Sequence, residues 1–268
     1  MSPSPRRAES DPRTTTYAHL TFKARCTEII KTGGYTAICE LGGGREPLFS
    51  PRDVADLGLA YTIVDVSQRE LDRAPVGYAK VCADVCSPDL VPAYDFVFSR
   101  MLAEHVRDGD AMHRNIFRLL SPGGTALHFF PTLYHPAFVA NRLLPTGLTG
   151  RLVRKLQPDR SADSKFPAYY SKCFGPTPKM RRYFTGLGYV IAAYRPFYGT
   201  SYLERIPGLR VLETAFDRAA ARRQSSRFSA FAWLELRKPD RRAGGGSLSA
   251  VPVTAAAQET RVAAKRIR

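Results

Sequence analysis

The chain has 268 residues, of which 44% are hydrophobic and 11% aromatic, so it can bury a full core and is not a disordered protein. Its formal net charge is +16. No apolar run approaches the ~18 residues that a membrane-spanning helix needs, and the opening residues lack an apolar signal core, so we expect a cytoplasmic protein.

Helix-like and strand-like segments alternate along the chain. A helix is expected over residues 17–32 and another between the fourth and fifth strands, ended by Ser121-Pro122-Gly123-Gly124. A third helical stretch has its apolar residues along one side, at Leu209, Leu212, Phe216 and Ala220. The expected strands are Thr36 to Leu41, Tyr61 to Val66, Gly77 to Ala83, Tyr94 to Ser99, Thr125 to Phe130, Tyr189 to Tyr194 and Phe228 to Leu236. This alternation predicts an α/β fold with a doubly wound, seven-stranded sheet.

Two tails flank the predicted domain of residues 17–240. Residues 1–16 and 241–268 have no sustained periodicity and are expected to be disordered, the second tail being basic. About fifty residues separate the fifth strand from the sixth, which is typical of a lid or a substrate-binding insertion. We therefore assign residues 131–188 and 196–227 to substrate-side insertions.

Cysteine usage argues against disulfides and metal. Five cysteines, an odd count, are scattered through the chain, which indicates reduced thiols. Cys82 and Cys86 have no second Cys/His pair at ligand spacing, so we expect no metal site.

The most informative motif follows the first strand. Glu40-Leu41-Gly42-Gly43-Gly44 places a carboxylate at the end of the strand and bare backbone after it, an arrangement suited to a nucleotide-like ligand. Binding of NAD would require Gly-x-Gly-x-x-Gly, and Pro47 occupies the position of the third glycine. The motif therefore favours S-adenosylmethionine over NAD.

Three further strand ends carry suitable side chains, and the carboxyl ends of parallel strands meet at one edge of a sheet. Asp65 can accept both ribose hydroxyls, and Asp84, followed by Val85, can accept the adenine amino group. Ser99 ends the fourth strand. Alone, a glycine triplet is an ordinary turn and an aspartate an ordinary helix cap. Together, in this order, they predict a cofactor site.

At these residues the chain resembles the class I, Rossmann-like S-adenosylmethionine-dependent methyltransferases, in particular a small-molecule branch with a Leu-Glu-His-Val motif. That motif appears here as Leu102-Ala103-Glu104-His105-Val106, after the apolar run that starts at Asp95. Residues 119–124, Leu-Leu-Ser-Pro-Gly-Gly, resemble the same family's turn before the fifth strand. The resemblance implies a mostly parallel sheet whose last strand is antiparallel. It also implies cofactor contacts at Glu40, Gly42, Gly44, Asp65, Asp84 and Ser99.

One position departs from the family. A third glycine often stands two positions after Gly44, where this chain has Glu46. A side chain there narrows the loop and adds negative charge.

The chemistry implied is attack on an already activated methyl group, so alignment matters most and a general base is optional. For a hydroxyl acceptor the candidate bases are His105, which could also be a helix-start residue, and His135, which lies beside Tyr134. His128 lies inside a strand and is expected to be structural. The candidate substrate-binding residues are Tyr134, Lys165, Tyr169 and Tyr170.

We expect a methyltransferase that acts on a small-molecule or lipid-linked acceptor, with a glycan or phenolic hydroxyl favoured. Apolar residues around 148–156 share a helical face opposite basic ones, a pattern that can rest on anionic membrane, although most such helices cap a core. An RNA-modifying enzyme, suggested by the sequence pI of about 9.9, is a minor alternative because no RNA-binding motif appears. A non-catalytic cofactor-binding or partner-binding module of the same fold stays open, as does the oligomeric state.

Overall fold

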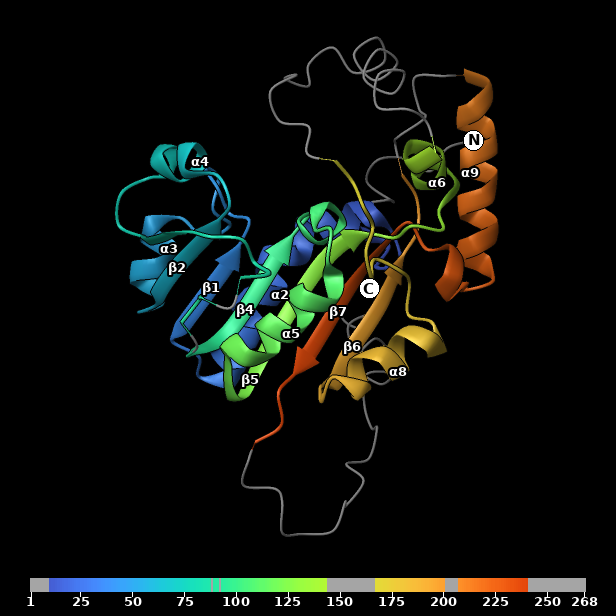
Figure 1. The fold of residues 1–268 in the computed structure, drawn as a ribbon. Helices are drawn as coiled ribbons and strands as arrows, with labels where there is room; N and C mark the ends of the chain where they lie inside the picture. The colour runs from blue at the N-terminus through green and yellow to red at the C-terminus, as the bar shows by residue number, and fades with distance from the viewer. Residues whose placement is uncertain (1–9, 88, 92, 144–166, 201–206, 241–268) are drawn as a thin grey trace, which may run out of the picture.

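The computed structural model describes residues 10–87, 89–91, 93–143, 167–200 and 207–240 (Figure 1). In chain order the elements are α2 (Thr15–Gly33), β1 (Ala37–Leu41), α3 (Pro51–Asp56), β2 (Ala60–Asp65), α4 (Gln68–Arg73), β3 (Ala79–Cys82), β4 (Tyr94–Arg100), η1 (Ala103–His105), α5 (Gly109–Leu119), β5 (Leu120–Pro131), α6 (Pro136–Leu143), α8 (Pro178–Gly186), β6 (Val190–Phe197), α9 (Pro207–Arg222), η3 (Ser226–Phe228) and β7 (Phe231–Arg237). No helix within these residues is long and apolar enough to cross a bilayer.

One seven-stranded sheet organises the domain, in the order β3-β2-β1-β4-β5-β7-β6. Strands β1 to β5 pair in parallel, and β7 is antiparallel to both β5 and β6. The predicted doubly wound sheet with an antiparallel last strand is confirmed. The strand order reverses between β1 and β4, which is where open α/β sheets bind their ligands.

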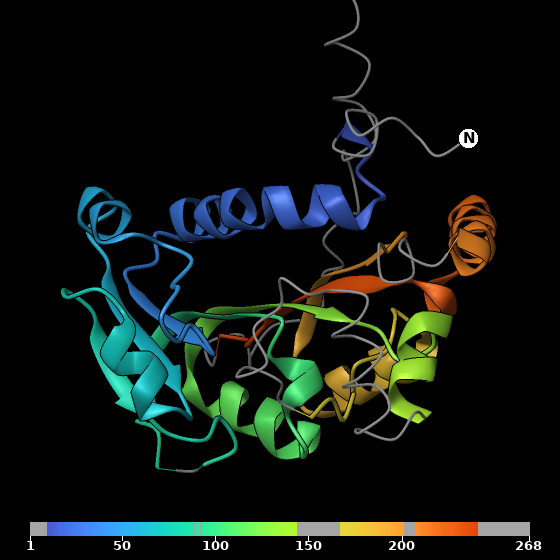
Figure 2. The same ribbon diagram turned by 90° about the horizontal axis from the view of Figure 1, so that it is seen from above.

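Helices cover both faces of the sheet, with α2 over one face and α5 over the other (Figure 2). Phe22 of α2 packs against Phe98, Phe129 and Trp233 from three strands. Because these aromatic side chains alternate with residues that face α5, the central strands β4, β5 and β7 are buried on both sides. The core therefore lies in two layers, one on each face.

Helix α2 begins earlier than predicted. Thr14 caps it by accepting a hydrogen bond from the backbone of Tyr17, and Gly34 ends it in the left-handed conformation. Thr14 also forms a parallel bridge with Tyr198, and the amide of Tyr198 donates to the Arg13 carbonyl. The expected disordered tail of residues 1–16 is therefore too long, because a partner distant in sequence orders its last residues.

The Ser121-Pro122-Gly123-Gly124 segment is not a separate turn. Helix α5 ends at Leu119, and these residues form the first part of β5, where the pairing with β4 shifts register. The Gly123 amide donates to the Lys238 carbonyl and the Lys238 amide donates to Gly124. The backbone after β7 thus supplies partners that make the segment part of the sheet.

The insertion after β5 is described only in part. It contains α6, the segment 167–177 and α8. The expected basic helix around residues 148–156 and the predicted substrate residue Lys165 lie outside the described residues, as does the basic tail from residue 241.

Candidate functional site

The glycine loop lies at the carboxyl end of β1, beside the point where the strand order reverses. Gly42 and Gly44 have φ angles of +73° and +46°, a region in which side chains are strained. A Cβ on Gly42 would lie 2.9 Å from Leu102 Cδ1, and one on Gly44 would lie 3.2 Å from Asp65 Oδ2. Glycine is therefore required here both by conformation and by space, as the sequence predicted.

Glu40 supports this loop from below. Its side chain is buried, its Oε2 accepts from the Tyr61 hydroxyl at 2.5 Å and from the Leu48 amide at 3.0 Å, and it lies under Gly43. Burial raises the pKa of Glu40 to about 7, although the bonds from Tyr61 and Leu48 and the charge of Arg100 oppose the rise. The carboxylate thus ties β1 to β2 and to the loop. Direct contact with a cofactor stays a prediction.

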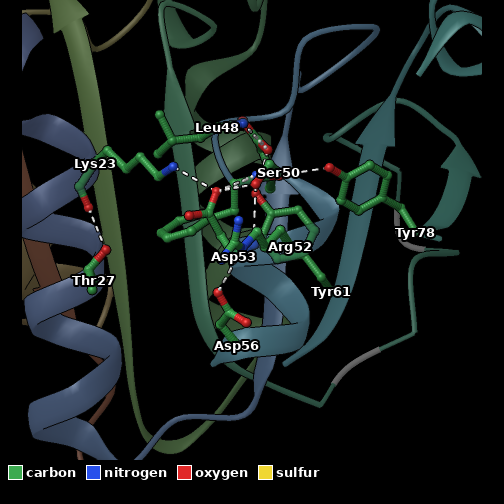
Figure 3. Close-up of polar contacts among 11 residues, drawn as sticks. Lys23, Thr27, Leu48, Ser50, Arg52, Asp53, Asp56, Tyr61 and Tyr78 are labelled. Carbon is green, nitrogen blue, oxygen red and sulfur yellow. Dashed lines mark hydrogen bonds and ion pairs between the residues drawn. The ribbon is translucent and has the colours of Figure 1, made fainter. Parts of the chain in front are cut away.

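A polar cluster around Asp53 fixes the segment after the loop (Figure 3). Ser50 and Asp53 form a capping box at the start of α3, and Lys23 of α2 reaches Asp53 Oδ2 at 2.7 Å. The hydrogen bond from Lys23 is the main reason that the pKa of Asp53 falls to about 2. The Tyr78 hydroxyl donates to the Phe49 carbonyl at 2.8 Å. No residue of α2 was predicted for the site, but these contacts join α2 to the segment that follows the glycine loop.

Asp65 is the last residue of β2, and Asp84 follows the neighbouring strand β3 at the same edge of the sheet. Asp65 is half-buried, and its Oδ1 accepts from the Ser67 amide at 2.9 Å. Burial, with some repulsion from Glu70, raises its pKa above the ordinary value. Asp84 is exposed and accepts from the Cys86 amide, while Val85 beside it is buried. The strand ends therefore present one carboxylate, Asp65, beside the glycine loop and a second, Asp84, one strand further along the same edge.

These residues fit the adenosine part of S-adenosylmethionine. Asp65 directly adjoins the glycine loop and can accept hydrogen bonds from hydroxyl groups. Gly44 leaves space beside it, where a Cβ would otherwise lie. Glu46, the departure from the family pattern, has an 85% exposed side chain and an ion pair with Arg45, so it points away from the loop.

Ser99 does not present its side chain to this edge. It is 1% exposed, and its Oγ lies 2.9 Å from Nδ1 of His128, a buried histidine of β5 on the α5 face of the sheet. A cofactor contact at Ser99 could come only from its backbone. The expectation that His128 is structural agrees with this pairing.

His105 and the segment after β4 are joined to the far end of the insertion. His105 Nδ1 lies 3.1 Å from the Pro167 carbonyl, so this nitrogen carries the proton and donates. The Glu104 carbonyl accepts from the amides of Tyr169 and Tyr170 at 2.7 and 3.0 Å. His105, whose side chain is 32% exposed, and Tyr169 are therefore brought together although they are distant in sequence.

Glu104 is a buried carboxylate that the sequence reasoning passed over. It is 3% exposed, its Oε1 lies 3.8 Å from His105 Nε2, and its Oε2 has no hydrogen-bond partner among the residues that the structure describes. Burial raises its pKa to about 8. Its place in the Leu-Ala-Glu-His motif was the available signal, but nothing in the sequence indicates that the side chain turns inward.

The structure does not support the predicted catalytic role of His135. Its ring is 1% exposed, Nε2 donates to Asp217 Oδ1 at 2.9 Å, and Nδ1 accepts from the Ala137 amide at 3.3 Å. With both nitrogens engaged, His135 joins the start of α6 to α9, which lie side by side (Figure 1). The buried face of α9 carries Asp217 and Glu213, while Leu212, from the predicted apolar side of the helix, is 67% exposed.

The predicted substrate residues divide into three groups. Tyr134 is 36% exposed and packs against Phe174 with ring centroids 5.1 Å apart, and Tyr169 is partly exposed. Tyr170 is 3% exposed and is buried in the core. Lys165 lies outside the described residues. Among the described ones, Tyr134 and Tyr169 are therefore the two that can face a ligand.

No metal centre was found in the described part of the chain, where no group of three His, Cys, Asp or Glu side chains is placed to hold an ion. All five cysteines are free thiols.

Residues 40–128 match the family described as "Methyltransferase domain". No curated protein matches the chain. Among solved structures, the cyclase SpnF aligns with a TM-score of 0.52 and 15% identity, covering 85% of this chain and 85% of that one. Phosphoethanolamine N-methyltransferase 2 of Haemonchus contortus, bound to S-adenosyl-L-methionine, aligns with a TM-score of 0.49 and 17% identity over 81% of this chain. The N-methyltransferase NodS of Bradyrhizobium japonicum has a TM-score of 0.48 and 11% identity, covering 87% and 99% of the two chains.

The chain spans 53% of the length of the Haemonchus enzyme. The alignment with SpnF supports the fold and nothing further.

Proposed function

Because this chain is a class I S-adenosylmethionine-dependent methyltransferase, we propose that it methylates a hydroxyl of a small-molecule or lipid-linked acceptor, with glycans and phenols as the favoured classes. When bound, the cofactor supplies a methyl group activated by its sulfonium. The protein's part is to bind, orient and exclude water.

The adenosine end would be held by the glycine loop, Asp65 and Asp84. The loop offers backbone without side chains, and the two aspartates offer acceptors at the ends of adjacent strands. Glu40 holds the loop in this conformation through Leu48 and Tyr61. This division leaves the end of β4 for the rest of the cofactor and for the acceptor.

The observation that supports a small acceptor is the double hydrogen bond to the Glu104 carbonyl. It fastens the segment around Tyr169 to the residues that follow β4, at the strand end where the acceptor would lie. A strand end covered by a segment of the same chain favours one small molecule or the head of a lipid over a folded polymer.

His105 is the proposed base for a hydroxyl acceptor. Its Nδ1 proton is committed to the Pro167 carbonyl, which leaves Nε2 as the nitrogen that accepts a proton. Glu104 Oε1 lies 3.8 Å from Nε2, and when its carboxyl is ionised it can stabilise the imidazolium that forms. Tyr134 and Tyr169 would contact the acceptor.

The test is transfer of radiolabelled methyl groups into a cell extract, using the wild-type protein and Asp65→Ala, with nuclease treatment and lipid extraction of the products. Label in the small-molecule or lipid fraction that depends on Asp65 supports the proposal. Label that disappears with nuclease would identify an RNA-modifying enzyme instead. Binding of S-adenosylhomocysteine without any transfer would indicate a non-catalytic module.

We also propose transient contact with anionic membrane, carried by the basic amphipathic segment around residues 148–156, which lies outside the described residues. Sedimentation with vesicles that contain phosphatidylserine, compared with neutral phosphatidylcholine vesicles, measures this. Equal sedimentation with both would remove the membrane from the account.

A further inference from the structure

Arg100 is an exposed cation at the carboxyl end of β4. Leu41 pairs with Ser99, so the residue after each, Gly42 and Arg100, lies at the same level of the edge. Among the described residues no carboxylate forms an ion pair with this guanidinium. The charge of Arg100 acts on Glu40, but that carboxylate already accepts from Tyr61 and Leu48.

Strand geometry places Arg100 on the face covered by α2. Side chains alternate between faces, so Arg100 shares a face with Phe98 and not with Ser99. Phe98 contacts Phe22 of α2, with ring centroids 6.3 Å apart. Phe129, the register partner of Arg100 on β5, contacts the same Phe22 at 5.6 Å.

His19 reaches this place from α2, three residues before Phe22 and so on the same face of the helix. Its ring packs edge-on against Phe129 at 4.6 Å and against Phe231 at 5.6 Å, while part of the side chain stays exposed. Partial burial, followed by the positive charge of Arg100, lowers the pKa of His19. A neutral imidazole next to the guanidinium offers an N–H donor without adding repulsion.

The order of the strands indicates which ligand Arg100 and His19 would bind. From β3 through β2 and β1 to β4, the edge presents Asp84, Asp65, the glycine loop and Arg100 in turn. Neighbouring strands are about 4.8 Å apart, so Arg100 lies about 10 Å from Asp65 across the loop. A molecule whose adenosine end is recognised by carboxylates and whose other end carries an amino-acid carboxylate matches this order of charges.

We propose that Arg100 and His19 form a carboxylate-binding subsite for the amino-acid end of the cofactor, an assignment that rests on the proposed function. Arg100 supplies the charge and a two-pronged set of donors that matches a carboxylate. His19 supplies a further donor and covers one side of the subsite.

The test is calorimetric titration with two probes, S-adenosylhomocysteine and 5′-methylthioadenosine, the second of which lacks the amino-acid end. Arg100→Gln should weaken S-adenosylhomocysteine binding by about 10- to 100-fold, as expected for loss of a charged hydrogen bond, and leave 5′-methylthioadenosine within about twofold of wild type. His19→Gln should act in the same direction with a smaller loss. Arg237→Gln removes the same charge from the exposed end of β7, at the opposite edge of the sheet, and should change neither affinity.

Unchanged binding of S-adenosylhomocysteine to Arg100→Gln would overturn the subsite. Equal weakening of both probes would also overturn it, because the loss would then come from the adenosine region or from the fold. If the wild-type protein bound neither probe, the proposed function itself would be wrong. Retained 5′-methylthioadenosine binding in the variant shows that it is folded.

Discussion

Tyr61 donates its hydroxyl proton to Glu40 Oε2 across 2.5 Å, in the interior between β1 and β2. The pair explains how a buried carboxylate can stand directly below a loop of three glycines. Without the Tyr61 hydroxyl, the buried Glu40 carboxylate would lose one of its hydrogen-bond donors. The same carboxylate also accepts from the Leu48 amide and so holds the segment after the glycine loop.

Tyr61→Phe should therefore lower the free energy of unfolding by about 1.5–3 kcal/mol, the range for a hydrogen bond to a charged group. Tyr78→Phe is the matched control, since its hydroxyl donates to the neutral Phe49 carbonyl, and about 1 kcal/mol is expected for it. Urea unfolding at pH 8 measures both. A smaller loss for Tyr61→Phe than for Tyr78→Phe would contradict the supporting role of Glu40.

Gly44→Ala should impair cofactor binding and not only stability. The left-handed backbone costs an alanine about 1–2 kcal/mol, and the new Cβ would also press on Asp65 at 3.2 Å. Gly58→Ala carries the same backbone cost, with no atom within 4 Å of its Cβ. We expect S-adenosylhomocysteine affinity to fall about tenfold or more for Gly44→Ala, equivalent to about 1.4 kcal/mol, and to be unchanged for Gly58→Ala. Similar affinities in the two variants would remove the loop from the site.

Glu104 predicts a dependence of stability on pH. Its pKa is raised to about 8 in the folded protein from an ordinary 4.5, so the folded state binds the proton more tightly. The stability that it contributes is complete below about pH 4.5 and is lost as the pH rises through 8, by about 1.4 kcal/mol per pH unit at most. The unfolding free energy of Glu104→Gln should therefore rise relative to that of wild type between pH 5.5 and 7.5. The exposed Glu46→Gln should show no such rise. Parallel unfolding curves for Glu104→Gln and wild type would contradict the burial of this carboxyl.

His128 predicts the opposite dependence of stability on pH. Burial lowers its pKa to about 4 from an ordinary 6.5, so the folded state excludes the proton. Its contribution is complete above about pH 6.5 and is lost as the pH falls toward 4, again by about 1.4 kcal/mol per unit at most. His128→Gln keeps an acceptor for Ser99 but does not titrate. Its unfolding free energy should fall less than that of wild type between pH 7 and pH 5, and an equal fall would show that burial does not lower the pKa of His128 in the folded protein.

The pattern of the sequence was sufficient to predict the sheet and to bring the candidate cofactor residues to one edge of it. Alternating strands and helices, with carboxylates and glycines at the strand ends, follow from local chemistry, and Glu40, Gly44 and Asp65 lie where that chemistry placed them. The strand order and the antiparallel β7 agree with the family resemblance.

The sequence pattern could not predict in which direction individual side chains point. Ser99 and Arg100 are neighbours at one strand end, and only the packing of α2 and α5 decides which of them faces the site. His135 was misjudged because its partner Asp217 lies 82 residues away, on a helix whose buried face carries acids. Local periodicity contains no information on such contacts.

The central claim is that the strand ends bind adenosine through Asp65, and calorimetric titration with S-adenosylhomocysteine, NAD and NADP tests it most directly. We predict that S-adenosylhomocysteine binds, that neither dinucleotide does, and that Asp65→Ala loses this binding while Asp56→Ala, at the exposed end of α3, retains it. Binding of NAD without binding of S-adenosylhomocysteine, or full retention in Asp65→Ala, would contradict the account.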